Sequence, residues 1–334
     1  MGQSASTLLR GNLSAVGLGS SLTADQVTEG IDLSQHTAIV TGGTSGIGKE
    51  TARVLAKRGA HVIIAGRKMD VAEDVKRVIL QESPSANVDM MQLDLTSVES
   101  VRSFVRDYES KNYPLSILVN NAGTFDTEFH STPMGIERMF ATHVVGPFLL
   151  TQLLLERMKQ TAKDTGIEGR VVVTGSDAHR ITSVLPQGVD FDSLKDPSRF
   201  SALKNYGQSK VAAILLTEEF GKKLKAENAN VTANVGHPGT VTTQLGRTFI
   251  DQAIPGPNKL TDKLYQLGKP ALKKPEEGAA TITFVATRPE VQGVYGRYYS
   301  DCTVIEPNRY ASNPELGKKV WQYCEDVVGA GVGA

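Results

Sequence analysis

A glycine-rich segment near the start of the chain follows directly on a short apolar run. The run Thr37–Thr41 has the length and composition of a buried strand, and residues 47–58 have the spacing of an amphipathic helix. Between them lies the sequence Gly42–Gly43–Thr44–Ser45–Gly46–Ile47–Gly48. Glycines allow a tight turn and let a phosphate approach the backbone, while the helix N-terminus offers free N–H groups. This order of strand, turn and helix predicts a nucleotide-binding site.

The same alternation of apolar runs and amphipathic stretches continues along the chain. Strands are expected at residues 37–41, 61–65, 88–93, 115–119, 170–174, 231–235 and 294–299. Helices are expected at residues 47–58, 69–81, 98–108, 135–159, 206–227 and 275–287. Repeated strand–helix–strand units predict an α/β fold, a doubly wound parallel sheet of the Rossmann type. We expect a single domain over residues 36–303, an N-terminal extension over 1–35 outside the core, and a C-terminal tail over 304–334.

The end of the second expected strand indicates which dinucleotide binds. An acidic residue there would accept hydrogen bonds from the adenosine ribose and repel a 2′-phosphate. This chain has Gly66 at the approximate place of the acid, followed by Arg67 and Lys68. A guanidinium matches a phosphate in fork geometry, so we expect NADP(H) as the cofactor. A solvated basic turn without a ligand would have the same sequence.

Further motifs occur in an order that resembles the short-chain dehydrogenase/reductase family, in its retinol-dehydrogenase-like branch. They are Asp94–Leu95, Asn120–Asn121–Ala122–Gly123, Tyr206–Gly207–Gln208–Ser209–Lys210 and Pro238–Gly239–Thr240–Val241–Thr242–Thr243. The resemblance spans roughly residues 36–303. It implies that Asp94 meets the adenine edge and that the Pro-Gly segment meets the nicotinamide. The expected cofactor residues are Gly42, Thr44, Ser45, Gly46, Ile47, Gly48, Arg67, Lys68, Asp94, Leu95, Asn121, Ala122, Gly123, Tyr206, Lys210, Pro238, Gly239, Val241 and Thr243.

Tyr206 and Lys210 are the expected core of a catalytic site. They are four residues apart, so on a helix they share one face. A free tyrosine is too weak an acid at neutral pH, and a nearby ammonium is expected to lower the pKa of its phenol. The resemblance implies that Tyr206 exchanges a proton with the substrate oxygen and that Lys210 holds the nicotinamide ribose. It also implies that Ser176, at the end of the fifth strand, donates a hydrogen bond to that oxygen.

The chain departs from the family pattern at His143. The family places an asparagine there, which anchors a water in a proton relay to the lysine. An imidazole has both a donor and an acceptor and can pass protons, but it is bulkier than the amide. We therefore expect a modified relay through His143, with weakened turnover as the alternative. His179, which follows Ser176 closely, is expected to be structural rather than catalytic.

Apolar residues in two segments are expected to form the wall of a substrate site. They are Ile181, Val184, Leu185 and Phe191 in one segment, and Leu245, Phe249, Ile254, Leu260, Leu264, Tyr265 and Leu267 in the other. The expected function is the interconversion of a lipophilic alcohol with its aldehyde or ketone, in the direction of reduction. One alternative is a membrane-tethered NADP(H)-binding sensor or scaffold with little turnover. Another is reduction of a double bond, since tyrosine and lysine also serve that chemistry.

Composition and the N-terminus bear on partners and location. Lys plus Arg equals Asp plus Glu, at 36 each, which gives no electrostatic case for nucleic acid. No apolar stretch of the length of a membrane span is evident, and no metal site is expected. Two cysteines do not make a disulfide framework, which favours the cytoplasm. The start Met-Gly-Gln-Ser-Ala-Ser matches a myristoylation pattern, so weak attachment to a cytosolic membrane face through Gly2 is expected. A homodimer is left open.

Overall fold

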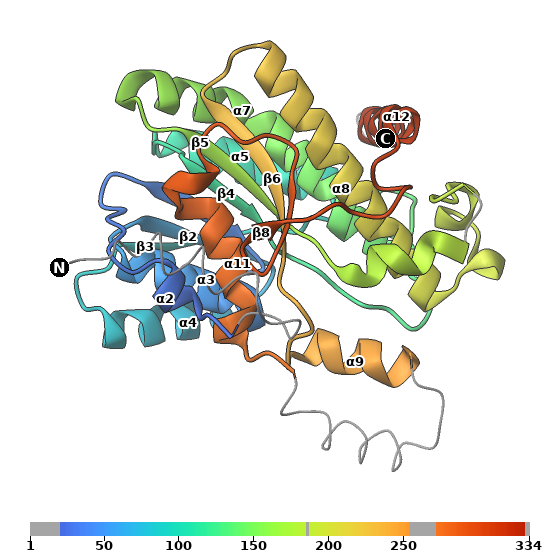
Figure 1. Ribbon diagram of the computed structural model, residues 1–334, viewed down its shortest axis with the longest axis horizontal. Helices are drawn as coiled ribbons and strands as arrows, with labels where there is room; N and C mark the ends of the chain where they lie inside the picture. The colour runs from blue at the N-terminus through green and yellow to red at the C-terminus, as the bar shows by residue number, and fades with distance from the viewer. Residues whose placement is uncertain (1–20, 185–186, 254–271, 331–334) are drawn as a thin grey trace.

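The computed structural model of the protein describes residues 21–184, 187–253 and 272–330. In these residues eight strands form one sheet of order β3-β2-β1-β4-β5-β6-β7-β8, in which β8 alone runs antiparallel to its neighbour (Figure 1). The strands are β1 Thr37–Thr41, β2 His61–Gly66, β3 Val88–Gln92, β4 Ile117–Asn120, β5 Gly169–Thr174, β6 Val231–His237, β7 Tyr298–Ser300 and β8 Thr303–Val304. The predicted doubly wound parallel sheet is confirmed.

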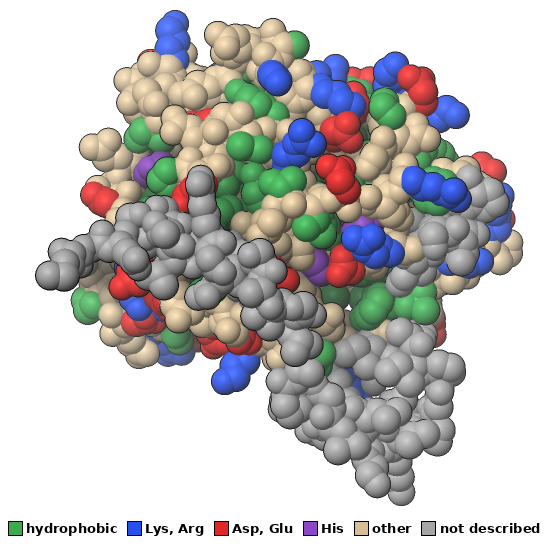
Figure 2. Space-filling model, viewed as in Figure 1, with side chains coloured by type: hydrophobic (Ala, Val, Ile, Leu, Met, Phe, Trp, Pro, Cys, Tyr) green, Lys and Arg blue, Asp and Glu red, His purple; other side chains and the backbone are tan. Residues whose placement is uncertain are grey.

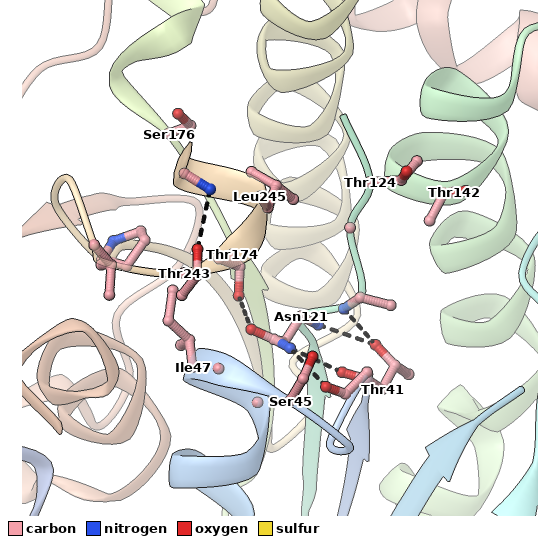
Figure 3. A pocket seen from close by; sticks show the side chains of 18 of the residues that line it. Thr41, Ser45, Ile47, Asn121, Thr124, Thr142, Thr174, Ser176, Thr243 and Leu245 are labelled. Atoms are coloured by element: carbon pink, nitrogen blue, oxygen red, sulfur yellow. Dashed lines mark hydrogen bonds between the residues drawn. The ribbon is translucent and has the colours of Figure 1, made fainter. Parts of the chain in front are cut away.

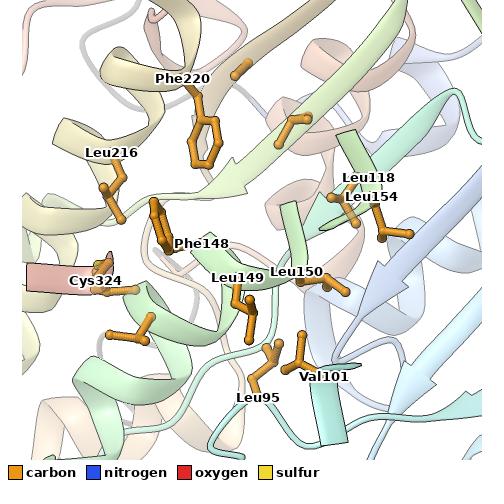
Figure 4. Packing of buried hydrophobic residues seen from close by; sticks show 14 of the residues in the cluster. Leu95, Val101, Leu118, Phe148, Leu149, Leu150, Leu154, Leu216, Phe220 and Cys324 are labelled. Atoms are coloured by element: carbon orange, nitrogen blue, oxygen red, sulfur yellow. The ribbon is translucent and has the colours of Figure 1, made fainter. Parts of the chain in front are cut away.

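Helices cover both faces of the sheet (Figure 1). The face that carries Ile39 is covered by α5 Val98–Ser110, α7 Gly146–Thr165, α8 Ala202–Ala226 and α12 Pro314–Ala330. The face that carries Ala38 and Val40 is covered by α2 Ala24–Val27, α3 Gly46–Lys57, α4 Met69–Glu82 and α11 Pro275–Thr287. Successive strand residues point to opposite faces, so the five buried residues of β1 supply both apolar cores. Figure 4 shows part of the first core, where Phe148 of α7 lies between α8 and α12.

The long helix expected over residues 135–159 is divided. It begins as α6 Arg138–Phe140, passes through a π-helical turn at Ala141–Val145, and continues as α7 to Thr165. Pro147 has no N–H to give to the carbonyl four residues earlier, so regular α-helical bonding cannot run through this point. Taken together, Arg138–Thr165 is long and apolar enough to cross a membrane, contrary to the expectation from sequence, but 72% of its most apolar window is buried in the protein. This burial is typical of the core helix of a globular domain.

The expectation that residues 304–334 form a tail is wrong for the stretch that folds as α12. This helix packs on α8 and α7 through Leu316, Val320, Cys324 and two further valines. Its Trp321 ring meets the rings of Phe148 and Phe220 at centroid distances of 5.0 and 4.8 Å. The apolar residues recur every three or four positions, which is the spacing of a helix with one buried face. The helix therefore completes the core on this side of the sheet.

The expectation that residues 1–35 lie outside the core is wrong for residues 24–33. Ala24, Val27 and Leu33 are buried against α3, α11 and the sheet. Thr23 begins α2 with a capping box in which Gln26 is the partner. A helix of four residues has too few turns to show a periodic pattern, so the sequence alone does not reveal it. Gly2, the expected site of lipidation, lies outside the described residues.

Charges of both signs are mixed over the face shown in Figure 2. This agrees with the equal numbers of basic and acidic residues in the chain. Many of the pairs are local, such as Lys318 with Glu315 on α12 and Lys222 with Glu219 on α8. Exposed pairs of this kind contribute little to stability, so the fold depends on its two apolar cores.

Shortening a side chain of α12 tests whether this helix belongs to the core. Val320 is fully buried, and we expect Val320→Ala to lower the free energy of unfolding by about 2 kcal/mol. Urea unfolding measures the change. Lys319→Ala, an exposed neighbour on the same helix, is the control and is expected to change stability by less than about 0.5 kcal/mol. Equal stability of the two variants would mean that α12 adds nothing to the core.

Candidate active site

The carboxyl ends of β1, β4, β5 and β6 open into one cleft of about 660 Å³ (Figure 3). Ligands of doubly wound sheets bind at this edge. Of the residues predicted for the site, two are not among those that line the cleft, Lys68 and His143. The others do line it: Gly42, Thr44, Ser45, Gly46, Ile47, Gly48, Arg67, Asp94, Leu95, Asn121, Ala122, Gly123, Ser176, Tyr206, Lys210, Pro238, Gly239, Val241 and Thr243.

The glycine-rich turn between β1 and α3 requires glycine because there is no room for a side chain at two of its positions. A Cβ atom on Gly42 would lie 2.8 Å from the Cα of Ala122, and one on Gly48 would lie 2.3 Å from the side-chain nitrogen of Asn121. Gly42 and Gly46 also have positive φ angles, of 64° and 51°. The first N–H groups of α3 have no partner within the helix, and they begin at the cleft. The turn therefore has the form of an anion-binding cradle.

Asn121 ties this turn to the two neighbouring strands. Its side-chain nitrogen donates to the carbonyl of Thr41 at 3.1 Å, and its backbone N–H donates to the Thr41 hydroxyl at 3.0 Å. The Thr174 hydroxyl, at the end of β5, donates to the Asn121 side-chain oxygen at 3.4 Å. Figure 3 shows these three residues meeting at the floor of the cleft. One amide side chain thus fixes the relative positions of the ends of β1, β4 and β5.

The basic turn after β2 lies at one end of the cleft. Arg67 is exposed, lines the cleft and has no ion pair among the described residues. Lys68 is the residue that precedes α4 and does not line the cleft. Asp94 lines the cleft after β3, but one carboxylate oxygen already accepts from the N–H and the hydroxyl of Thr96, at 2.9 and 2.7 Å. Arg67 is therefore the described cation best placed to meet a phosphate at this end.

Tyr206, Lys210 and Ser176 come together at the other end. Tyr206 and Lys210 lie on α8, each with 6% of its surface exposed, and the Lys210 ammonium nitrogen is 5.6 Å from the centre of the Tyr206 ring. The ammonium donates to the carbonyl of Thr174 at 3.0 Å. Ser176 follows β5, and its side chain lies close enough to the Tyr206 phenol to influence the pKa of that group. His179 donates from Nδ1 to the Ser176 carbonyl at 2.6 Å, a structural contact that holds the serine backbone.

Burial governs the ionisation of this group. It raises the pKa of Tyr206 to about 12, with the Ser176 hydrogen bond acting in the opposite direction, and it lowers the pKa of Lys210 to about 8. The expected lowering of the pKa of Tyr206 by Lys210 is therefore wrong for this structure. Burial destabilises the phenolate more than the hydrogen bond from Ser176 stabilises it, so the pKa of Tyr206 rises. At neutral pH Tyr206 is a protonated phenol, which can donate a proton.

Two aromatic side chains pack against the ring of Tyr206. Phe125 and Phe249 lie with their ring centres 5.3 and 5.6 Å from that of Tyr206 and 5.4 Å from each other. Phe249 and Leu245 come from α9 Gln244–Ala253 and line the cleft, as predicted. Phe125 was not predicted, although an aromatic residue two positions after the Asn-Asn-Ala-Gly segment is a signal that could have indicated it. Phe249 thus bounds the reacting end of the cleft, and Phe125, which does not line the cleft, packs against Phe249 and Tyr206.

The other predicted wall residues do not extend this boundary. Phe191 packs against Tyr323 of α12, with ring centres 4.9 Å apart, and is not among the residues that line the cleft. The side chains of Ile181 and Val184, together with all of Leu185, Ile254, Leu260, Leu264, Tyr265 and Leu267, lie outside the described residues.

His143 lies behind the cleft, in the π-helical turn. The Thr124 N–H donates to its Nε2 at 2.9 Å, so Nδ1 carries the proton and donates to the Ser209 hydroxyl at 2.8 Å. That hydroxyl donates in turn to the carbonyl of Tyr206 at 2.7 Å. Burial and the nearby Lys210 hold the pKa of His143 well below its usual value, so the ring is neutral. A proton relay through the imidazole would have to break one of these bonds.

Comparisons with known proteins agree with this geometry. Residues 36–185 match the family model described as short chain dehydrogenase. Short-chain dehydrogenase TIC 32 B, chloroplastic, from Brassica napus is 44% identical over 317 residues, which cover 95% of this chain and 96% of the relative. Polyprenol dehydrogenase from Homo sapiens is 36% identical over 289 residues, 86% of this chain and 84% of the relative. An uncharacterized protein of known structure from Mycobacterium paratuberculosis has a TM-score of 0.68 at 25% identity, over 93% of this chain and 98% of that one.

The similarity to the Brassica napus protein extends over almost the whole of both chains. The structure adds a glycine-rich turn, a buried tyrosine and lysine, and a half-buried serine at the same edge of a parallel sheet. The protein therefore belongs to the short-chain dehydrogenase/reductase family of oxidoreductases.

Proposed function

We propose that the protein reduces a lipophilic aldehyde or ketone with NADPH as cofactor. The observation that carries this proposal is the surroundings of Tyr206. Ser176 lies beside its phenol, the Lys210 ammonium is 5.6 Å from the centre of its ring, and the rings of Phe125 and Phe249 pack against it. A carbonyl group that reaches the phenol would leave its substituents against apolar rings.

The cleft fits an extended dinucleotide from one end to the other. Arg67 would hold the 2′-phosphate, the glycine-rich turn and the N-terminus of α3 would hold the pyrophosphate, and the segment Pro238–Thr243 would meet the nicotinamide. The close packing of Gly42 against Ala122 and of Gly48 against Asn121, which brings the N-terminus of α3 to the cleft, is the observation that supports this fit. NADPH, when bound, supplies the hydride for the reduction.

The side chains of the protein supply the proton and the charge stabilisation. Tyr206, a phenol at neutral pH, donates its proton to the substrate oxygen as negative charge develops there. Ser176, held next to Tyr206, donates a hydrogen bond to the same oxygen. Lys210 keeps a positive charge near both groups below its pKa of about 8. The protonated state of Tyr206 favours reduction over oxidation, because oxidation of an alcohol needs a phenolate as base.

The lipophilic character of the substrate is supported from two directions. Within the protein, Tyr206 belongs to a small apolar cluster with Phe125, Met139 and Ala178, against which Leu245 packs. Among its relatives, a protein 36% identical carries the name polyprenol dehydrogenase. We extend this substrate class, but no particular molecule, to the present chain.

A series of straight-chain aldehydes tests the proposed reaction together with Tyr206→Phe. With wild-type protein and NADPH, kcat/KM is expected to rise with chain length, by up to about fourfold per added methylene, because each methylene buries apolar surface. Tyr206→Phe keeps the ring but lacks the proton donor, so we expect turnover to fall at least about 100-fold. The rate of NADPH oxidation gives both results.

The affinity of Tyr206→Phe for NADPH, measured by fluorescence titration, is the control and should stay within about threefold of wild type, because the ring still packs. Wild-type turnover in this variant would refute the role of Tyr206. A wild-type protein that binds NADPH but reduces none of the aldehydes or the matching 2-ketones would refute the proposed reaction.

Reversing the charge of Arg67 tests the choice of cofactor. Arg67→Asp removes a charge-assisted contact and adds a repulsion, so NADPH binding is expected to weaken by about 2–3 kcal/mol while NADH binding changes little. Arg77→Asp is the matched control, since Arg77 is an exposed arginine on α4 that pairs with Asp74. Dissociation constants for both cofactors give the preference. An unchanged NADPH/NADH ratio in Arg67→Asp would show that Arg67 does not contact the 2′-phosphate.

Three substitutions of His143 separate a hydrogen-bonding role from proton transfer. Glutamine places an amide oxygen where Nε2 accepts from Thr124, and asparagine places an amide nitrogen where Nδ1 donates to Ser209. His143→Gln and His143→Asn are each expected to keep more than about a third of the wild-type turnover. His143→Leu loses both hydrogen bonds, so its turnover should fall roughly tenfold or more. If the imidazole carries protons, the three variants should be equally poor. Turnover as a function of pH distinguishes the two results.

A further inference from the structure

A lysine outside the cleft packs beneath the segment expected to meet the nicotinamide. Lys273 lies between Thr240 and Thr242 in a parallel bridge: its N–H donates to the Thr240 carbonyl at 2.9 Å, and its carbonyl accepts from the Thr242 N–H at 2.8 Å. Its side chain runs along Gly239, where an added Cβ would lie 2.9 Å from the lysine Cδ and 3.1 Å from Cε. The side chain is 14% exposed. The segment Pro238–Thr243 therefore rests on Lys273.

The ammonium group of Lys273 ends at a rigid turn in another part of the chain. It forms an ion pair with Asp301, in the two-residue turn between β7 and β8. Asp301 and Cys302 both have left-handed backbones, with φ of 49° and 59°, as the tight turns of hairpins require. The Cys302 N–H donates to the Thr281 hydroxyl of α11 at 3.3 Å, and its side chain is buried in the second core. The turn is thus a fixed anchor for the lysine.

We propose that Lys273 and Asp301 are positioning residues for the nicotinamide half of the cofactor. Their ion pair holds Pro238–Thr243 against the β7–β8 turn and so sets the height of this segment over the reacting end of the cleft. The inference rests on the proposed function, because it needs a nicotinamide cofactor in this cleft. Arg67, at the adenosine end, is expected to act independently of it. Loss of the pair should therefore weaken binding of a whole dinucleotide and leave an adenosine fragment unaffected.

The experiment compares NADPH with adenosine 2′,5′-bisphosphate, which has the adenosine and its 2′-phosphate but no nicotinamide. Lys273→Met keeps the apolar stem and removes the charge, and Asp301→Asn removes the opposite charge while asparagine still tolerates the left-handed backbone. Each variant is expected to raise the dissociation constant of NADPH roughly three- to tenfold and that of the bisphosphate less than twofold. The double variant should lose no more than either single variant, because both changes break the same interaction.

Two variants control for other causes. Lys274→Met makes the same change at an exposed neighbour and should bind NADPH as the wild type does. Lys273→Arg keeps the charge and should restore binding to within about twofold of wild type. The thermal unfolding temperature of each variant without ligand verifies that it folds. If Lys273→Met does not fold, Asp301→Asn and Lys273→Arg still decide whether the ion pair affects NADPH binding.

Equal loss of both ligands, no loss of either, or additive losses in the double variant would overturn the inference and leave the proposed function standing. A wild-type protein that binds neither NADPH nor NADH would overturn the proposed function, and the inference with it.

Discussion

The close contact between the glycine-rich turn and Asn121 is the interaction on which the rest of the site depends. Gly42 and Gly48 have no side chains, so the turn and the start of α3 lie directly against Ala122 and Asn121 at the end of β4. The side-chain nitrogen of Asn121 donates to the carbonyl of Thr41 in β1, and its side-chain oxygen accepts from the hydroxyl of Thr174 in β5. The amide of Asn121 is partly buried, and polar groups away from water are usually paired because an unpaired group costs free energy there. The edge of the sheet is therefore rigid where a nucleotide would lie and where Ser176 begins.

Burial of the tyrosine and the lysine gives the reacting end its acid–base character. Burial raises the pKa of Tyr206, which is charged when it loses its proton. It lowers the pKa of Lys210, which is charged when it gains one. Both shifts favour the uncharged form. Phe249, which packs against Tyr206 and lines the cleft, thus contributes both to the burial of the phenol and to the wall of the cleft. An apolar substrate that excludes water further would act in the same direction.

The sequence predicted the fold and most of the cleft because both depend on local patterns. Buried strands, the glycine-rich turn and the Tyr-x-x-x-Lys spacing are each visible in a few consecutive residues. What it could not predict depends on partners far along the chain. Whether α12 is a tail or part of the core is decided by Phe148 and Phe220, and the pKa of Tyr206 is decided by its burial among residues from several elements. The position of His143 follows from the π-helical turn Ala141–Val145 just before Pro147, whose effect on the helical register no periodic pattern reveals.

The packing of α12 also bears on how the chain is made. A nascent protein emerges from the ribosome in order, and domains fold as their residues become available. The first six strands and the helices α5, α7 and α8 are synthesised well before α12, yet Phe148 and Phe220 then lack the aromatic ring that covers them. Until α12 is synthesised, an apolar strip along α7 and α8 remains open to water and to other chains.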